Sequence, residues 1–151
     1  MSSIYPLVAA LLANVIAQVL KPIVLYFRTK ELDVHKCIAR GGYPSSHSST
    51  VTALTIAIGM NEGFDSALFA ITCVFSFIVI YDAANVRYYA GRNIQLTKQL
   101  ISDLETLKGL KFNDPIYHEK IKSVLGHKFI EILGGILLGI LVSLSMYQLI
   151  H

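Results

Sequence analysis

Apolar residues along this chain fall into long blocks separated by polar stretches. Two blocks, Ile4–Leu20 and Ser66–Tyr81, contain no charged residue. A third block, Phe129–Ile150, is interrupted only by the acid Glu131. A helix needs roughly 17 to 25 residues to cross about 30 Å of hydrocarbon. The blocks therefore predict three membrane helices, the first two of them short.

A fourth segment, Ser45–Met60, carries only Ser, Thr and one His as polar groups. It is rich in small residues, among them Ser48, Ser49, Ala53 and Ala57. Small side chains let membrane helices approach closely, and hydroxyl groups can form hydrogen bonds between them. We therefore expect this helix inside a bundle of four membrane spans. The alternative is a buried helix of a soluble all-α protein.

The composition agrees with an all-α membrane bundle. Of the 151 residues, 54% are hydrophobic and 15% are charged, whereas soluble domains carry roughly 25% charged residues. This composition excludes a disordered chain, and two cysteines are too few for a disulfide framework. The length predicts a single domain over residues 1–151. The net charge of +3 comes without a clustered basic stretch, which argues against nucleic acid as a partner.

The basic residues collect in two of the predicted loops. Residues 28–42 and 82–128 contain most of the Lys and Arg, whereas the turn at 61–65 is acidic. The positive-inside rule then places both basic loops in the cytoplasm and both termini outside the cell membrane.

Within the longer loop, leucines recur at helical spacing from Leu96 to Leu107. A second stretch, residues 114–125, begins with Asp-Pro and shows the same periodicity. Both predict amphipathic helices. We expect these helices at the membrane surface or over the bundle, rather than bound to a partner protein.

Lys21 and Arg28 are seven residues apart, so on a helix they share one face with a rise of about 10.5 Å between them. Two long cations on one stripe can converge on a single anion. The alternative is that Lys21 only extends its ammonium group toward the membrane surface.

The segment Gly41–His47 leads into the small-residue helix with two glycines, a proline and two serines. Ser45 can cap this helix, whose first N–H groups have no partner within the helix and attract oxyanions. His47 stands in the first turn, where it can donate a proton to a bound group. A serine cap without a catalytic role is the alternative.

Two further pairs lie at the same predicted membrane face. Asp82 ends the third span and is followed by Arg87, whose guanidinium can bind phosphate oxygens bidentately or simply anchor the helix at the interface. His127 and Glu131 are four residues apart and face the same way, so the carboxylate can orient the imidazole as a base or nucleophile. A metal site is the rival explanation for this last pair, but the sequence offers no further ligands for it.

Cations, an anion-binding helix start and two histidines at one membrane face describe a site for phosphoryl transfer. Three of the motifs, in this order, resemble the signature motifs of the type-2 phosphatidic acid phosphatase superfamily, which includes vanadium-dependent haloperoxidases: Lys21-x6-Arg28, Pro44-Ser45-Ser46-His47 and His127-x3-Glu131. The whole chain is most similar to the divergent branch of small membrane proteins, described as acid phosphatase or haloperoxidase related.

The resemblance implies a membrane phosphatase that requires no metal or other cofactor. By this resemblance, His127 would attack phosphorus to form a phosphohistidine, Glu131 would orient its ring, and His47 would protonate the leaving oxygen. The side chains that would hold the phosphoryl oxygens are Lys21, Arg28, Ser45, Ser46 and Arg87. Asp82 would support this site.

The sequence departs from the superfamily pattern at several positions. Thr29 stands where the superfamily has Pro, Ser46 where it has Gly, and Glu131 where it has Asp. Arg87 lies forty residues before His127, whereas the usual third motif places its Arg close ahead of its His.

We therefore expect an enzyme that hydrolyses a phosphate monoester or diphosphate at the cytoplasmic face. The membrane location favours a phosphorylated lipid as its substrate. The alternative is a non-catalytic membrane protein that binds phosphorylated headgroups or anions at the same residues. A homo-oligomer is compatible with the sequence.

Overall fold

The computed structural model describes residues 4–30, 42–108 and 129–150 of the chain, and in these residues all regular structure is helical. The elements, in chain order, are α1 (Tyr5–Thr29), α2 (Ser46–Glu62), α3 (Ala67–Tyr81), η2 (Asp82–Val86), α4 (Arg87–Lys108) and α6 (Phe129–Ile150). The four apolar or small-residue segments thus form helices close to their predicted bounds, and the all-α prediction is confirmed. The amphipathic stretch predicted at 114–125 lies outside the described residues.

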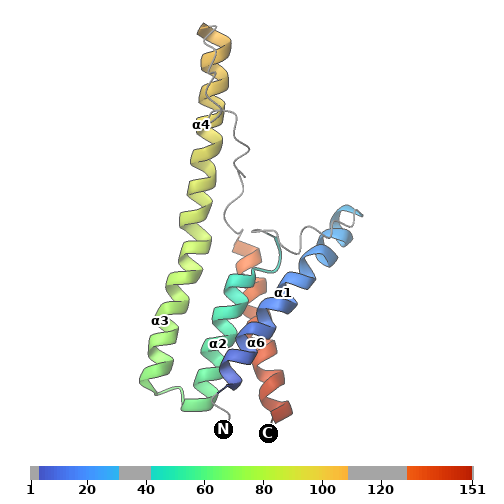
Figure 1. The fold of residues 1–151 in the computed structure, drawn as a ribbon, viewed down its shortest axis with the longest axis vertical. Helices are drawn as coiled ribbons and strands as arrows, with labels where there is room; N and C mark the ends of the chain where they lie inside the picture. The colour runs from blue at the N-terminus through green and yellow to red at the C-terminus, as the bar shows by residue number, and fades with distance from the viewer. Residues whose placement is uncertain (1–3, 31–41, 109–128, 151) are drawn as a thin grey trace.

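Three helical stretches in the described part of the chain are long and apolar enough to cross a membrane. They are Tyr5–Phe27, Ala67–Leu104 and Phe129–Ile150. Successive helices of the bundle run in opposite directions, so that both ends of the chain lie at the same end of the bundle (Figure 1). The fourth predicted span, α2, has 17 residues and lies among the others.

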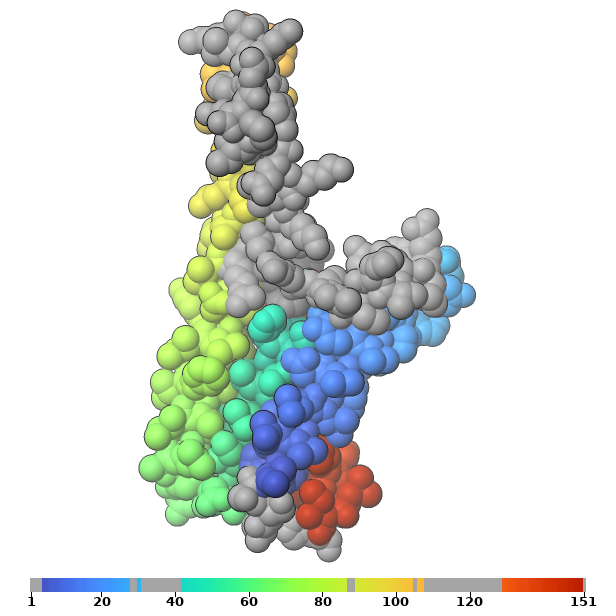
Figure 2. Space-filling model, viewed as in Figure 1, coloured from blue at the N-terminus to red at the C-terminus, as the bar shows by residue number. Residues whose placement is uncertain are grey.

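Helix α2 occupies the centre of the bundle, in contact with α1, α3 and α6. Its small residues are the ones that the neighbouring helices bury, including Ser48, Ser49, Ala53 and Ala57. In the space-filling view α2 shows only as a strip between α1 and α3 (Figure 2). The prediction that this segment lies inside the bundle is therefore confirmed, and its modest hydropathy reflects contact with protein more than with lipid.

Helix α6 approaches α2 closely because it presents glycines at the contact. A Cβ atom added to Gly135 would overlap the carbonyl oxygen of Ser45, and one added to Gly139 would lie 2.5 Å from the carbonyl oxygen of Ser49. The Gly135-x3-Gly139 spacing places both glycines on one face of α6. Such small-residue pairs bring the backbones of membrane helices together.

Helix α1 crosses both α2 and α6 and packs on them through a row of alanines. Ala9, Ala13 and Ala17 are spaced four residues apart and are fully buried. At the beginning of α1, the hydroxyl of Tyr5 donates to the carbonyl oxygen of Ser143 in α6 over 2.9 Å. These contacts pack the first half of α1 against α2 and α6.

Helix α3 packs against α2 and exposes most of its large apolar side chains, as expected for a helix with a lipid-facing side. The helical backbone continues past the end of α3 at Tyr81. The π-helical turn η2 follows directly, and α4 then runs on in the same line, away from the bundle (Figure 1). The predicted amphipathic helix at Leu96–Leu107 therefore forms as part of α4, which continues the line of α3 and does not cover the bundle (Figure 1).

Candidate functional site

The polar motifs that the structure describes meet at one end of the bundle, opposite the chain termini. The second half of α1, the start of α2 and the start of α6 all lie at this end (Figure 1). Alternating helix directions produce this arrangement, since motifs at the end of one helix and the start of the next share one membrane face.

Lys21 is buried in the second half of α1, with only 4% of its surface exposed. Its Nζ donates to Oε1 of Gln18 over 2.8 Å and lies 3.4 Å from Oγ of Ser46 at the start of α2. A charged side chain buried in a membrane bundle marks a functional site by default, because its burial is costly. The ammonium group therefore points at the start of α2 and does not extend away from the bundle.

Two features of the backbone lie next to Lys21: a proline inside α1 and a glycine with positive φ in the loop before α2. Pro22 lies inside α1 and lacks the N–H that would donate to the carbonyl oxygen of Gln18. The loop that precedes α2 passes beside Lys21 at Gly42, whose φ of 108° is a conformation that only glycine adopts readily. A Cβ atom at Gly42 would lie 3.9 Å from Cγ of Lys21.

Arg28 belongs to the last turn of α1, two turns beyond Lys21. Its backbone position agrees with the predicted shared face, and its side chain lies outside what the structure describes.

Ser45 is the N-cap of α2. Its Oγ accepts from the N–H of Ser48 over 3.3 Å and from the Ser48 hydroxyl over 3.0 Å, and its carbonyl oxygen accepts the N–H of Ser49. The predicted cap is confirmed. Ser45 and Ser46 are both buried, with 0% and 2% of their surfaces exposed.

His47 lies in the first turn of α2, half-buried, and its Nδ1 atom is buried. The first turn of a helix directs its N–H groups outward along the helix axis. The dipole of α2 and the Lys21 ammonium therefore make the start of α2 a positive region.

The start of α6 is tied to the start of α2 through the main chain. The N–H of Ser45 donates to the carbonyl oxygen of Glu131 over 2.9 Å. Glu131 is half-buried in the first turn of α6. The ring of Tyr43 lies directly over Gly134, where a Cβ atom would overlap it. His127 precedes α6 and lies outside the described residues.

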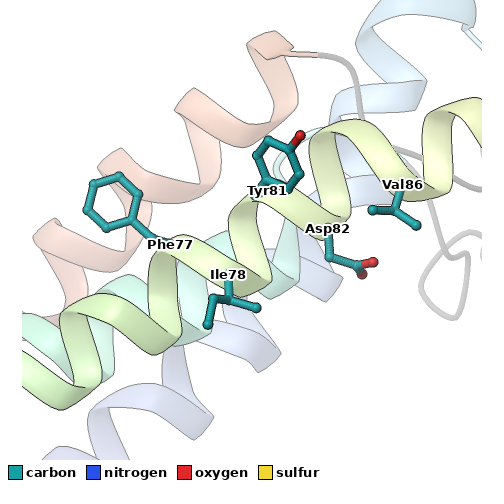
Figure 3. A pocket seen from close by; sticks show the side chains of 5 residues that line it. All are labelled: Phe77, Ile78, Tyr81, Asp82 and Val86. Atoms are coloured by element: carbon teal, nitrogen blue, oxygen red, sulfur yellow. The ribbon is translucent and has the colours of Figure 1, made fainter.

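Asp82 is the first residue of η2, directly after the end of α3. It is half-buried in η2 and lines a shallow hollow of about 470 Å³ together with Phe77, Ile78, Tyr81 and Val86. Figure 3 shows that all five side chains come from one continuous length of α3 and η2. Arg87 follows at the first residue of α4, and its side chain is outside the described part.

The described residues thus bring Lys21, Ser45 and Ser46 together, with His47 and the main chain of Glu131 alongside them. Sequence reasoning missed Gln18, which contacts both Lys21 and Ser46. A signal was present, because Gln18 is three residues before Lys21 on the same face of an otherwise apolar helix. Within the ranges described, no group of three His, Cys, Asp or Glu side chains is arranged to hold a metal ion.

These features define a class: an integral membrane protein of packed helices, with a cationic, hydroxyl-rich site at one end of the bundle. The chain belongs to the Divergent PAP2 family, whose model matches residues 3–142. It is similar to a protein named "Uncharacterized membrane protein YuiD" from Bacillus subtilis (strain 168). The two are 36% identical over 147 residues, which cover 94% of this chain and 93% of that protein. No solved structure matches the chain.

Proposed function

We propose that the protein is an integral membrane phosphatase that hydrolyses a phosphate monoester or diphosphate of a lipid at the cytoplasmic face of the cell membrane. The observation that carries the proposal is the Lys21 ammonium, buried and held 3.4 Å from Ser46 at the start of α2. A buried cation at a helix N-terminus is suited to bind a phosphate group. Membership of the Divergent PAP2 family supports phosphate chemistry at this position.

The reaction has two balanced steps. In the first, a ring nitrogen of His127 attacks phosphorus, the P–O bond to the leaving group breaks, and His47 gives its proton to the leaving oxygen, that of an alcohol from a monoester or of a monophosphate from a diphosphate. In the second, water attacks the phosphohistidine, His47 takes the proton from that water, and phosphate leaves as His127 is regenerated. The Glu131 carboxylate orients the His127 ring.

Charge neutralisation supplies the rest of the catalysis. In phosphoryl transfer the protein mainly positions the reactants and stabilises the charge on the phosphoryl oxygens. In this proposal Lys21, Arg28 and Arg87 supply the positive charges, and the N–H groups of the first turn of α2 supply further donors. Ser45 keeps its cap bonds, which leave its hydroxyl proton available to a phosphoryl oxygen.

The test is phosphate release by the purified full-length protein from vesicles containing phosphatidic acid, an isoprenyl phosphate or an isoprenyl diphosphate. His127→Ala is expected to reduce release to background because it removes the nucleophile, and orthovanadate is expected to inhibit the wild-type protein. His118→Ala, at a histidine that the proposed mechanism does not use, is the control and should retain activity.

A protein that binds orthovanadate or inorganic phosphate but releases no phosphate from any of these lipids would contradict catalysis. That result would favour the alternative, a membrane protein that binds phosphorylated headgroups. In that case Lys21→Met should weaken binding, whereas His127→Ala should leave it nearly unchanged.

A further inference from the structure

Gln18 joins the two halves of the proposed anion site. Its Oε1 accepts from Nζ of Lys21 over 2.8 Å, and its Nε2 donates to Oγ of Ser46 over 3.3 Å. Nζ of Lys21 is in turn 3.4 Å from the same Ser46 oxygen. The three side chains therefore close a triangle of hydrogen bonds between α1 and α2.

The chemistry of the three groups fixes the direction of these bonds. An ammonium group only donates, so the amide of Gln18 must present its oxygen to Lys21 and its nitrogen to Ser46. Ser46 then accepts from both neighbours, which engages both lone pairs of its oxygen. The Ser46 hydroxyl can still donate its own proton, and a phosphoryl oxygen is a suitable acceptor for it.

The surroundings keep this triangle in place. Ser46 is 98% buried and Lys21 is 96% buried, from exposed fractions of 2% and 4%. The carbonyl oxygen of Ser46 also accepts from the hydroxyls of Ser49, over 3.0 Å, and Thr50, over 2.7 Å. The first turn of α2 is thus closed by side-chain as well as main-chain hydrogen bonds.

We propose that Gln18 is a positioning residue of the phosphate site. It holds the Lys21 ammonium at the start of α2 and converts Ser46 into a hydrogen-bond donor toward the bound anion. This proposal rests on the proposed function, because the anion is the phosphoryl group of that site. The proposal gives Ser46, which stands where the superfamily motif has Gly, the role of a hydrogen-bond donor to the anion.

The chain offers a matched control for Gln18. Asn14 lies one turn earlier on the same face of α1, and its Nδ2 donates to Oγ1 of Thr50 over 2.9 Å. It makes the same kind of α1–α2 hydrogen bond farther from the start of α2. Loss of stability from removing such a bond should therefore be similar at the two positions.

The experiment compares wild type, Gln18→Met, Gln18→Glu and Asn14→Leu as purified full-length proteins in detergent. Two quantities are measured for each: the thermal midpoint, and the affinity for orthovanadate and for inorganic phosphate. Gln18→Met is expected to bind both anions roughly 10-fold or more weakly, as for loss of a hydrogen bond to a charged group. Asn14→Leu should lower the thermal midpoint similarly and bind within about 2-fold of wild type.

Gln18→Glu separates positioning from structural support. The carboxylate still accepts from Lys21, so the thermal midpoint should stay at or above that of Gln18→Met. The carboxylate also neutralises the charge of the Lys21 ammonium and repels an anion, so the affinity for orthovanadate and phosphate should fall further than in Gln18→Met. A role limited to helix packing would move affinity and midpoint together.

Equal anion affinity in wild type, Gln18→Met and Gln18→Glu would overturn the positioning role while leaving the proposed function intact. If Gln18→Met fails to fold, the comparison of Gln18→Glu with Asn14→Leu decides the question in the same way. Absence of orthovanadate and phosphate binding in the wild-type protein would instead refute the proposed function itself.

Discussion

Gly135 determines how closely α6 approaches the start of α2. A Cβ atom at this position would overlap the carbonyl oxygen of Ser45 and lie 2.9 Å from Cβ of Ser48. The obstacle is largely backbone, which cannot rotate away as a side chain can. The contact therefore requires glycine at this residue.

Gly135→Ala is expected to destabilise the bundle. Alanine gains about 1 kcal/mol of helix propensity over glycine, but overpacking a tight contact costs about 1–3 kcal/mol, and separation of the helices adds lost packing. We expect a net loss of about 1–2 kcal/mol, measured by unfolding the protein in mixed micelles with increasing SDS. Leu141→Ala, on the exposed face of the same helix, should change stability by no more than about 0.5 kcal/mol. An unchanged unfolding midpoint for Gly135→Ala would contradict the close contact.

Individual residues of the site were predictable to different degrees. The burial cost of a charge singled out Lys21, and the helix start singled out the Ser45 cap. Spacing alone left two interpretations of Lys21 open, and its burial next to Ser46 argues against extension of the ammonium group toward the membrane surface. The contact of Gln18 with Ser46 could not be predicted from the sequence, because periodicity gives the face on which a residue lies and not the helix that faces it.

At the scale of elements, α2 and α3 are joined by a small group of hydroxyls. Oγ1 of Thr55 and Oγ of Ser76 are 2.7 Å apart, and Ser76 also donates to the carbonyl oxygen of Val51 over 3.1 Å. Because α3 presents much of its apolar surface outward, this polar contact specifies how it pairs with α2.

Ser76→Ala is therefore expected to loosen α3 from α2. Hydrogen bonds between membrane helices contribute about 0.6 kcal/mol on average and at most about 1.7 kcal/mol, so a loss within that range is expected in the same SDS titration. Ser145→Ala, at an exposed position of α6, is the matched control and should have no measurable effect. Equal midpoints for the two variants would show that the hydroxyl contact contributes nothing.

The sequence predicts the extent of each helix better than it predicts how the helices are connected. Long apolar blocks indicate where α1, α3 and α6 lie, and small residues mark α2 as internal. The continuity of α3 with α4 was missed because the charge of Asp82 indicates the end of a membrane span. Charge reports the membrane boundary, whereas η2 shows that the helical backbone continues past that boundary.

At the scale of the whole molecule, loop charge predicts the orientation in the membrane. We expect α4 in the cytoplasm and the end of α6 on the opposite side. Single cysteines at Gln99 and Gln148, both exposed, test this in a background in which Cys37 and Cys73 are replaced by Ala. A membrane-impermeant maleimide should label Gln148→Cys in intact cells and Gln99→Cys only after permeabilisation. Labelling in the reverse pattern would place the site on the outer face.

The link between Ser45 and Glu131 has a consequence for how this site can change over evolutionary time. It joins an N–H to a carbonyl oxygen, so it does not depend on which side chain either residue carries. Mutations can alter the acid at the start of α6 or the hydroxyl at the start of α2 while the two helix starts stay in register. Only proline at residue 45 would remove the donor. A scaffold of this kind tolerates drift in its chemical groups, and related sequences can acquire different chemistry on an unchanged frame.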